Sequence, residues 1–164
     1  MKDSALIEKI IDRRLEAVFP SREEVLRRLS EEQGLKIYFG IDPTGPLHLG
    51  HVVSLLFLKD LATLGHKPIV LMGDFTAQVG DPTDKTAVRQ ALTEEQVREN
   101  MAGYPEQIEK IMPRGSFNVQ YNSKWLKGMS FGDVVQLASR TTVQQMLARD
   151  MFQERLKQEK PIFV

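Results

Sequence analysis

The chain of 164 residues contains no cysteine, which excludes disulfide bonds and thiolate metal ligands. It also has no excess of charge of one sign, since 22 basic residues balance 22 acidic ones, so a nucleic-acid partner would have to bind a local patch. No apolar run approaches the roughly 18 to 20 residues of a membrane span, and the first residues lack the pattern of an export signal. We therefore expect a cytoplasmic protein that is neither secreted nor inserted into a membrane.

The composition is that of a folded domain. Hydrophobic residues make up 41% of the chain and charged residues 27%, which argues against a disordered or fibrous protein. A chain of this length can bury roughly two thirds of its unfolded surface in a single core. We expect one folded unit with no second complete domain.

The pattern of apolar residues predicts alternating helices and strands. Apolar residues recur at helical spacing between Leu6 and Val18, and a capping box formed by Ser21 and Glu24 begins a second helix that Gly34 ends. Short apolar runs indicate strands at residues 35–41, 68–72 and 118–121, and helical segments are expected at 47–64, 93–111 and 130–160. An N-terminal helical hairpin followed by this alternation predicts an α/β fold, with right-handed crossovers and a parallel sheet covered on both faces.

Ligands of open parallel sheets bind beyond the carboxyl ends of the strands. Residues 42–51 and 73–89 follow two predicted strands and are rich in glycine, proline, threonine and aspartate. We expect these two loops to form the binding site.

Two histidines mark the first of these loops. His48 and His51 are three positions apart at the start of a predicted helix, so both imidazoles lie on one face of its first turn, with the bare backbone of Gly50 between them. The start of a helix offers unpaired backbone N–H groups and partial positive charge. This arrangement favours stabilisation of a phosphate group in a transition state over abstraction of a proton.

Four segments give the chain a specific resemblance. They are the run 42–51, which looks like the "HIGH" motif of class I aminoacyl-tRNA synthetases with Tyr38-x-Gly40 before it, then Gly73-Asp74-Phe75-Thr76, Gly80-Asp81-Pro82-Thr83 and Tyr121-Asn122-x-x-Trp125. Their order and approximate spacing resemble those of bacterial tyrosyl-tRNA synthetases. The resemblance implies a Rossmann-like (HUP-type) parallel sheet with flanking helices, incomplete in this chain.

The resemblance also assigns site residues. Tyr38 would contact the phenol hydroxyl of a substrate tyrosine, and Asp81 would contact its ammonium group. Lys85 and Arg89 would bind the departing pyrophosphate. The implied catalytic residues are His48, His51, Thr44, Lys85 and Arg89; those for ATP are Asp42, Pro43, His48, Gly50 and His51; those for tyrosine are Tyr38, Gly40, Asp42, Thr76, Asp81 and Asn122.

The implied activity is that of a tyrosine–tRNA ligase. Such an enzyme activates L-tyrosine with ATP and Mg²⁺ as substrate and transfers it to tRNA-Tyr; no tightly bound cofactor and no protein-bound metal are expected. Residues 1–34 would form an N-terminal helical segment, and residues 35–164 the first part of the catalytic domain with the start of its connective insertion. That insertion would make a homodimer, with apolar material from Met146, Leu147, Met151, Phe152 and Leu156.

Two features depart from the family pattern. Only three residues separate Thr44 from His48, one fewer than in many bacterial tyrosyl enzymes. The chain also looks like about the first two fifths of the family protein, without the Lys-Met-Ser-Lys-Ser loop or the anticodon-binding domains. Complete catalysis by this chain alone is therefore not expected.

Other interpretations remain open at this point. His48 and His51 could be helix-surface residues or a metal pair without its third ligand, and Lys85 and Arg89 could lie on a solvated helix face. A tryptophanyl-type synthetase or another nucleotidyltransferase with the same histidine motif is an alternative enzyme. A non-catalytic module that dimerises or binds RNA is the alternative outside enzymes.

Overall fold

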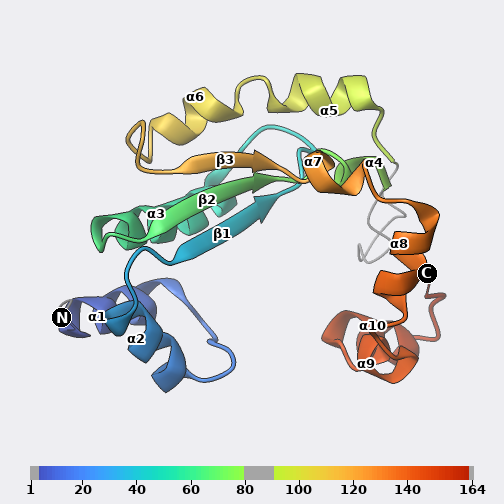
Figure 1. Cartoon of the computed structure of the whole chain (residues 1–164), viewed down its shortest axis with the longest axis horizontal. Coiled ribbons are helices and arrows are strands. Elements are labelled where there is room, and N and C mark those ends of the chain that lie inside the picture. Colours follow the sequence, from blue (N-terminus) through green and yellow to red (C-terminus); the bar gives the residue numbers. More distant parts are fainter. Residues whose placement is uncertain (1–3, 80–90, 163–164) are drawn as a thin grey trace.

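A computed structural model describes residues 4–79 and 91–162. Its centre is a sheet of three strands: β1 (Lys36–Ile41), β2 (Lys67–Met72) and β3 (Asn118–Tyr121). Helices precede, connect and follow the strands, and Figure 1 shows them around the sheet. The predicted α/β class and the three predicted strands are confirmed.

The strands are parallel and stand in the order β1-β2-β3. Ile41 pairs with Met72, and Met72 pairs with Tyr121, so the last residues of all three strands lie in one row. Side chains at paired positions of a parallel sheet point to the same face. This register determines which residues lie next to each other at the carboxyl edge of the sheet.

The helices that connect the strands pack against one face of the sheet. That face carries Ile41, Val70 and Met72, which form one core with Leu55 and Leu58 of α3 (Leu49–Thr63) and with residues of the second connection. The second connection consists of α4 (Thr76–Val79), α5 (Glu94–Met101) and α6 (Tyr104–Glu109). The connection from β1 to β2 and the connection from β2 to β3 both move to the next strand in the same direction across the sheet. Two right-handed crossovers in one direction place their helices on the same face of the sheet. The expectation of cover on both faces is therefore not met by these connections.

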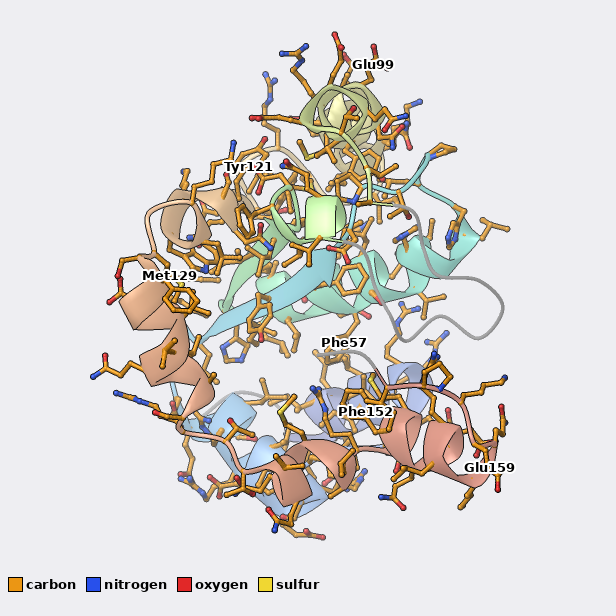
Figure 2. The ribbon with its side chains drawn as sticks, turned by 90° about the vertical axis from the view of Figure 1, so that its right-hand side faces the viewer. Phe57, Glu99, Tyr121, Met129, Phe152 and Glu159 are labelled. Atoms are coloured by element: carbon orange, nitrogen blue, oxygen red, sulfur yellow. The ribbon has the colours of Figure 1, made fainter. Side chains whose placement is uncertain are left out.

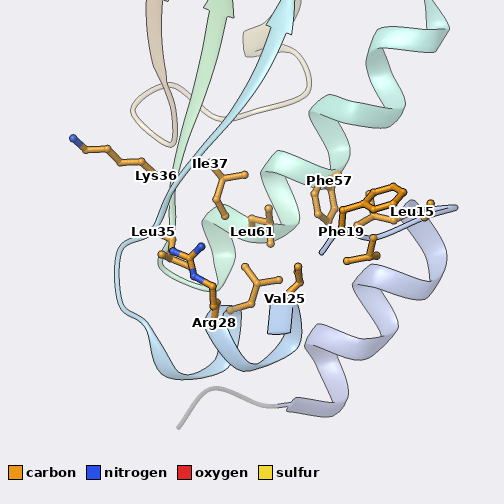
Figure 3. Close-up of a pocket in the computed structure, with 12 residues that line it drawn as sticks. Leu15, Phe19, Val25, Arg28, Leu35, Lys36, Ile37, Phe57 and Leu61 are labelled. Atoms are coloured by element: carbon orange, nitrogen blue, oxygen red, sulfur yellow. The ribbon is translucent and has the colours of Figure 1, made fainter. Parts of the chain in front are cut away.

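The N-terminal hairpin packs on the outer side of α3. Ile7 and Ile11 of α1 (Ser4–Arg14) and Leu29 of α2 (Arg22–Glu31) form a second apolar cluster with Leu61 of α3. Between the hairpin, the start of β1 and α3 lies an apolar cavity of about 330 Å³, whose wall includes Leu15, Val25, Ile37, Phe57 and Leu61 (Figure 3). The predicted hairpin is confirmed, although its first helix ends at Arg14 and not near Val18.

The C-terminal helices extend beyond the carboxyl edge of the sheet (Figure 1). They are α7 (Ser123–Leu126), α8 (Phe131–Ala138), α9 (Val143–Leu147) and α10 (Asp150–Lys157). None of their residues is buried, and Phe131 is 83% exposed. None of the helices in the described ranges combines the length and apolar character that crossing a membrane requires.

Two local differences from the sequence prediction have simple causes. The helix expected across 93–111 is divided into α5 and α6 by Gly103, after which Pro105 stands in the first turn of α6. Proline has no N–H to bond the preceding turn, so a continuous helix is interrupted there. The loop expected after Gly73 contains the single-turn helix α4, whose first residue, Thr76, has its hydroxyl oxygen 3.3 Å from the Gly73 carbonyl oxygen.

Candidate active site

The residue that follows each strand lies at one edge of the sheet. Asp42 follows β1, Gly73 follows β2 and Asn122 follows β3. Backbone hydrogen bonds continue the sheet by one step, from Gly73 N–H to the Ile41 carbonyl (2.8 Å) and from Asn122 N–H to the Met72 carbonyl (3.0 Å). The register therefore brings a carboxylate, a bare backbone position and an amide together.

The position of Gly73 between its neighbours leaves room for their side chains. A Cβ atom added at Gly73 would lie 1.9 Å from Asp42 Oδ1 and 2.7 Å from Thr76 Oγ1. That space is occupied by the hydrogen bond from the Thr76 hydroxyl to the Asp42 carboxylate, which is 2.9 Å long. Any side chain at position 73 would separate these two groups.

Asn122 completes the network from the third strand. Its side chain is buried, with 7% of the residue exposed. Its Nδ2 donates to Thr76 Oγ1 at 3.0 Å, and its Oδ1 accepts from Phe75 N–H at 2.9 Å. Asn122 thus ties the end of β3 to the loop after β2 and holds the hydroxyl that bonds Asp42.

A cavity of about 280 Å³ opens at this network. Four of the residues expected to contact tyrosine line it together, namely Gly40, Asp42, Thr76 and Asn122. Tyr38 lies two positions before Gly40 in β1, on the face of the sheet that α3 does not cover, and is 70% exposed. Figure 2 views the molecule from this edge, with Tyr121 at the end of β3.

The two histidines form the start of α3. His48 is the N-cap residue, and its Nδ1 accepts a hydrogen bond from Gly50 N–H at 3.1 Å. Nδ1 of His51 accepts from His48 N–H at 3.2 Å, and the two rings lie 4.0 Å apart between centroids. A ring nitrogen that accepts a hydrogen bond carries no proton, so each neutral imidazole has its hydrogen on Nε2. Each ring can therefore donate one hydrogen bond to a ligand.

Gly50 has a role that the sequence did not reveal. A Cβ atom there would lie 2.9 Å from Cε1 and 3.0 Å from Nδ1 of His48. The missing side chain therefore accommodates the imidazole of the protein's own N-cap residue, in addition to the close ligand approach expected from the sequence.

Electrostatics keep the second imidazole neutral. Partial burial lowers the pKa of His51 below the ordinary 6.5, and the neighbouring His48 lowers it further. A neutral ring retains the Nδ1 lone pair that accepts from the backbone. Within residues 4–79 and 91–162 no group of three histidine, aspartate or glutamate side chains could hold a metal ion, so the alternative of a metal pair gains no third ligand there.

The loop between β1 and α3 carries two further expected residues, Pro43 and Thr44. Pro43 is buried and Thr44 is exposed. The Pro43 carbonyl accepts from Asn100 Nδ2 at 2.8 Å, and the Gly45 carbonyl accepts from the Tyr104 hydroxyl. No sequence signal singled out Asn100 or Tyr104. Asp81, Lys85 and Arg89 lie outside the described residues.

Comparison with known proteins places these features in a family. The family model of class I tRNA synthetases (W and Y) matches residues 30–164. The tyrosine–tRNA ligase of Carboxydothermus hydrogenoformans is 42% identical over 160 residues, which are 95% of this chain and 39% of that protein. The tyrosine–tRNA ligase of Desulfotalea psychrophila is 46% identical over 149 residues, covering 88% of this chain and 37% of that protein. The chain thus spans about two fifths of the length of these curated relatives.

Solved structures share the fold. A C-terminally truncated mitochondrial tyrosyl-tRNA synthetase of Aspergillus nidulans superposes with a TM-score of 0.77 at 22% identity, over 96% of this chain and 49% of that one. A tyrosyl-tRNA synthetase of Archaeoglobus fulgidus, complexed with L-tyrosine, gives a TM-score of 0.68 at 23% identity, over 87% of this chain and 42% of that one. These similarities confirm the expected Rossmann-like fold.

The contact at Gly73 predicts a selective effect of adding one methyl group. Gly73→Ala should lower the free energy of unfolding by about 1–3 kcal/mol, because the new Cβ overlaps the Asp42–Thr76 hydrogen bond. The matched control is Gly40→Ala, where a Cβ would meet nothing within 4 Å, and its change should stay within about 0.5 kcal/mol. Urea unfolding of the two variants makes the comparison; equal changes would contradict the assigned role of Gly73.

The environment of His51 predicts that the stability of the folded chain depends on pH. The folded-state pKa of His51 is lowered, so its contribution to stability is present above the unfolded pKa and declines as the pH falls through the folded pKa. An NMR titration should give His51 a pKa below 6.5, with ¹⁵N shifts of an Nε2–H tautomer at neutral pH. A pKa above that of a histidine in an unfolded peptide would exclude this arrangement.

Proposed function

The chain belongs to the class I tRNA synthetases (W and Y), and on this premise we propose that it is the ATP- and tyrosine-binding part of a tyrosine–tRNA ligase. The observation that carries the proposal is the single edge where the histidine pair of α3 and the cavity of Asp42, Thr76 and Asn122 meet the strand ends. The names and identities of the curated relatives favour tyrosine over tryptophan as the substrate.

The reaction needs two substrates held end to end. The tyrosine carboxylate attacks the α-phosphorus of ATP, the bond to the β-phosphate oxygen breaks, and pyrophosphate leaves as tyrosyl-adenylate forms. A hydroxyl of the terminal ribose of tRNA-Tyr then attacks the tyrosyl carbonyl and releases AMP. Mg²⁺ enters as part of the ATP substrate.

The residues act mainly by positioning and by stabilising charge. The Nε2–H groups of His48 and His51 would donate to phosphate oxygens, where negative charge increases in the transition state. The N-terminus of α3 adds a favourable dipole, since α3 is 15 residues long. Thr44, Pro43 and Gly50 would border the nucleotide, and Lys85 and Arg89 would bind the pyrophosphate.

The tyrosine pocket would use the open face of the sheet. Tyr38 would bond the substrate hydroxyl, and a pocket that offers such a partner penalises phenylalanine, which leaves a buried polar group unpaired. Gly40 gives the substrate room, since no atom lies within 4 Å of the place of a Cβ there. Asp42, Thr76 and Asn122 would border the reacting end, and Asp81 would pair with the ammonium group.

The division of the chain into domains and its cellular location remain predictions within the same proposal. Residues 1–34 would be the N-terminal helical segment, and residues 35–164 the start of the catalytic domain and its insertion. A cytoplasmic location is also still a prediction. A different nucleotidyltransferase with the same histidine pair would have no reason to combine it with Tyr38 and Asp81.

Activity assays test the proposed substrate. The chain should be joined to the remaining C-terminal part of the Carboxydothermus hydrogenoformans relative, which it matches at 42% identity. We expect tyrosine to drive exchange of pyrophosphate into ATP in this chimera, with the exchange lost in His48→Ala and His51→Ala variants of equal stability. Exchange driven by tryptophan, or exchange without an amino acid, would contradict the proposal. The unmodified relative is the positive control.

The C-terminal helices support a further part of the proposal, that two copies pair through them. Phe131, Leu137 and Val143 are 83%, 58% and 68% exposed, and Met146, Met151 and Leu156 extend this surface. Apolar patches of this kind mark protein interfaces. A second copy is the occupant that the family resemblance implies, and the half-buried Leu147 and Phe152 belong to the same helices.

Sedimentation velocity tests the pairing. The chain should sediment as a dimer of 18.7 kDa protomers, and Leu137→Glu should convert it to a monomer by placing a charge in the interface. Leu6→Glu is the matched control, because Leu6 is 43% exposed but belongs to α1. A wild-type chain that stays monomeric at high concentration would refute pairing through this surface.

A further inference from the structure

The loop between β1 and α3 cannot hold its own shape by regular hydrogen bonding. Pro43 and Pro46 have no backbone N–H, so two of its residues offer only acceptors. The Thr44 N–H bonds the Asp42 carbonyl at 2.8 Å and closes a tight turn. The carbonyls on either side of Thr44, those of Pro43 and Gly45, accept hydrogen bonds from side chains elsewhere in the chain.

Those donors come from one distant helical pair. Asn100 Nδ2 donates to the Pro43 carbonyl at 2.8 Å, and the Tyr104 hydroxyl donates to the Gly45 carbonyl. The donors lie 57 and 59 positions along the chain from their acceptors. Asn100 lies in the last turn of α5 and Tyr104 begins α6 four positions later, so one pair of consecutive helices supplies both donors.

The donor side is rigidly anchored. Tyr104 is 1% exposed and packs in the main core with Leu55, Ile108 and Met112. Burial raises the pKa of its phenol above the ordinary value, so the hydroxyl stays protonated and continues to donate at neutral pH. At the other end of the loop, Leu47 packs against the same core. The loop is thus attached to the main core at Tyr104 and at Leu47.

We propose that Asn100 and Tyr104 are positioning residues that hold the Pro43–Gly45 segment in the conformation that receives ATP. This inference rests on the proposed function. Carbonyls fixed on both sides of Thr44 hold the backbone of the loop and set where the chain enters the N-cap at His48. Neither residue touches substrate in this proposal. Their effect reaches the nucleotide through the loop, which is three residues long between Thr44 and His48.

A pair of conservative variants tests the proposal in the whole chain. Tyr104→Phe removes only the hydroxyl and keeps the buried ring, and Asn100→Asp replaces the donating amide by an acceptor. Each variant should raise the Kd for ATP about five- to tenfold, the effect of losing one hydrogen bond, and leave the Kd for tyrosine within twofold. Amide hydrogen exchange at Thr44 and His48 should accelerate, while exchange in β2 should not change.

Matched controls separate positioning from general stability. Tyr121→Phe removes a hydroxyl with no hydrogen bond among the described residues, and Asn118→Asp makes the same amide change at the exposed amino end of β3. Both should leave ATP affinity and loop exchange unchanged. If Tyr104→Phe and Asn100→Asp lower ATP and tyrosine affinity equally, together with exchange protection throughout the sheet, they are structural residues only and the inference fails.

The Kd for ATP and the amide hydrogen exchange together show whether the inference or the proposed function is wrong. In one outcome the wild-type chain binds no ATP, while both variants still accelerate amide hydrogen exchange at Thr44 and His48. The proposed function would then be wrong for this chain, and so would the assignment of ATP to the loop. If the wild-type chain binds ATP and neither variant changes its Kd or the loop exchange, the inference is wrong and the proposed function is untouched.

Discussion

The parallel register of three short strands determines the chemistry of this molecule. Because Ile41, Met72 and Tyr121 share one row, the residues that follow them share the next, and that row consists of Asp42, Gly73 and Asn122. The middle position has no side chain, so the outer two can be linked through the Thr76 hydroxyl. A slip of the pairing by one residue would move every side chain to the opposite face and separate this network. The cavity at the edge exists only in this register.

A second constraint is that, among the described residues, the helices that connect the strands cover one face of the sheet. Because the strand order is β1-β2-β3, both crossovers run in one direction across the sheet, and α3 and the α5–α6 pair pack against the same face of the sheet. The other face keeps Tyr38 exposed, and the cavity lined by Gly40 and Leu71 opens from it. The core and the proposed substrate pocket are consequently on different sides of three strands.

Sequence patterns predicted much of this arrangement because local rules govern it. The three strands, the N-cap at Ser21 and the capping box at Thr93 follow from apolar periodicity and from side chains that bond nearby N–H groups. The reciprocal bond of a full capping box is not formed at Ser21, because the Glu24 carboxylate accepts from Arg27 instead. His48 and His51 were predicted to share one turn, and they do. The contributions of Gly73, Asn100 and Tyr104 could not be predicted, since each depends on an atom more than thirty positions away that only the folded chain brings near. The contact between the His48 imidazole and the backbone of Gly50 depends on the side-chain rotamer of His48, which the spacing of the two residues in the sequence does not specify.

The proposed function depends on the Nε2–H groups of His48 and His51 donating to phosphate at the start of α3. Side-chain ¹H–¹⁵N NMR of the histidines, with ATP and with adenosine added in parallel, measures this directly. ATP should shift the Nε2 resonances of both His48 and His51, while adenosine, which has no phosphate, should leave them near their free positions. Nε2 resonances that respond equally to the two ligands, or to neither, would contradict it.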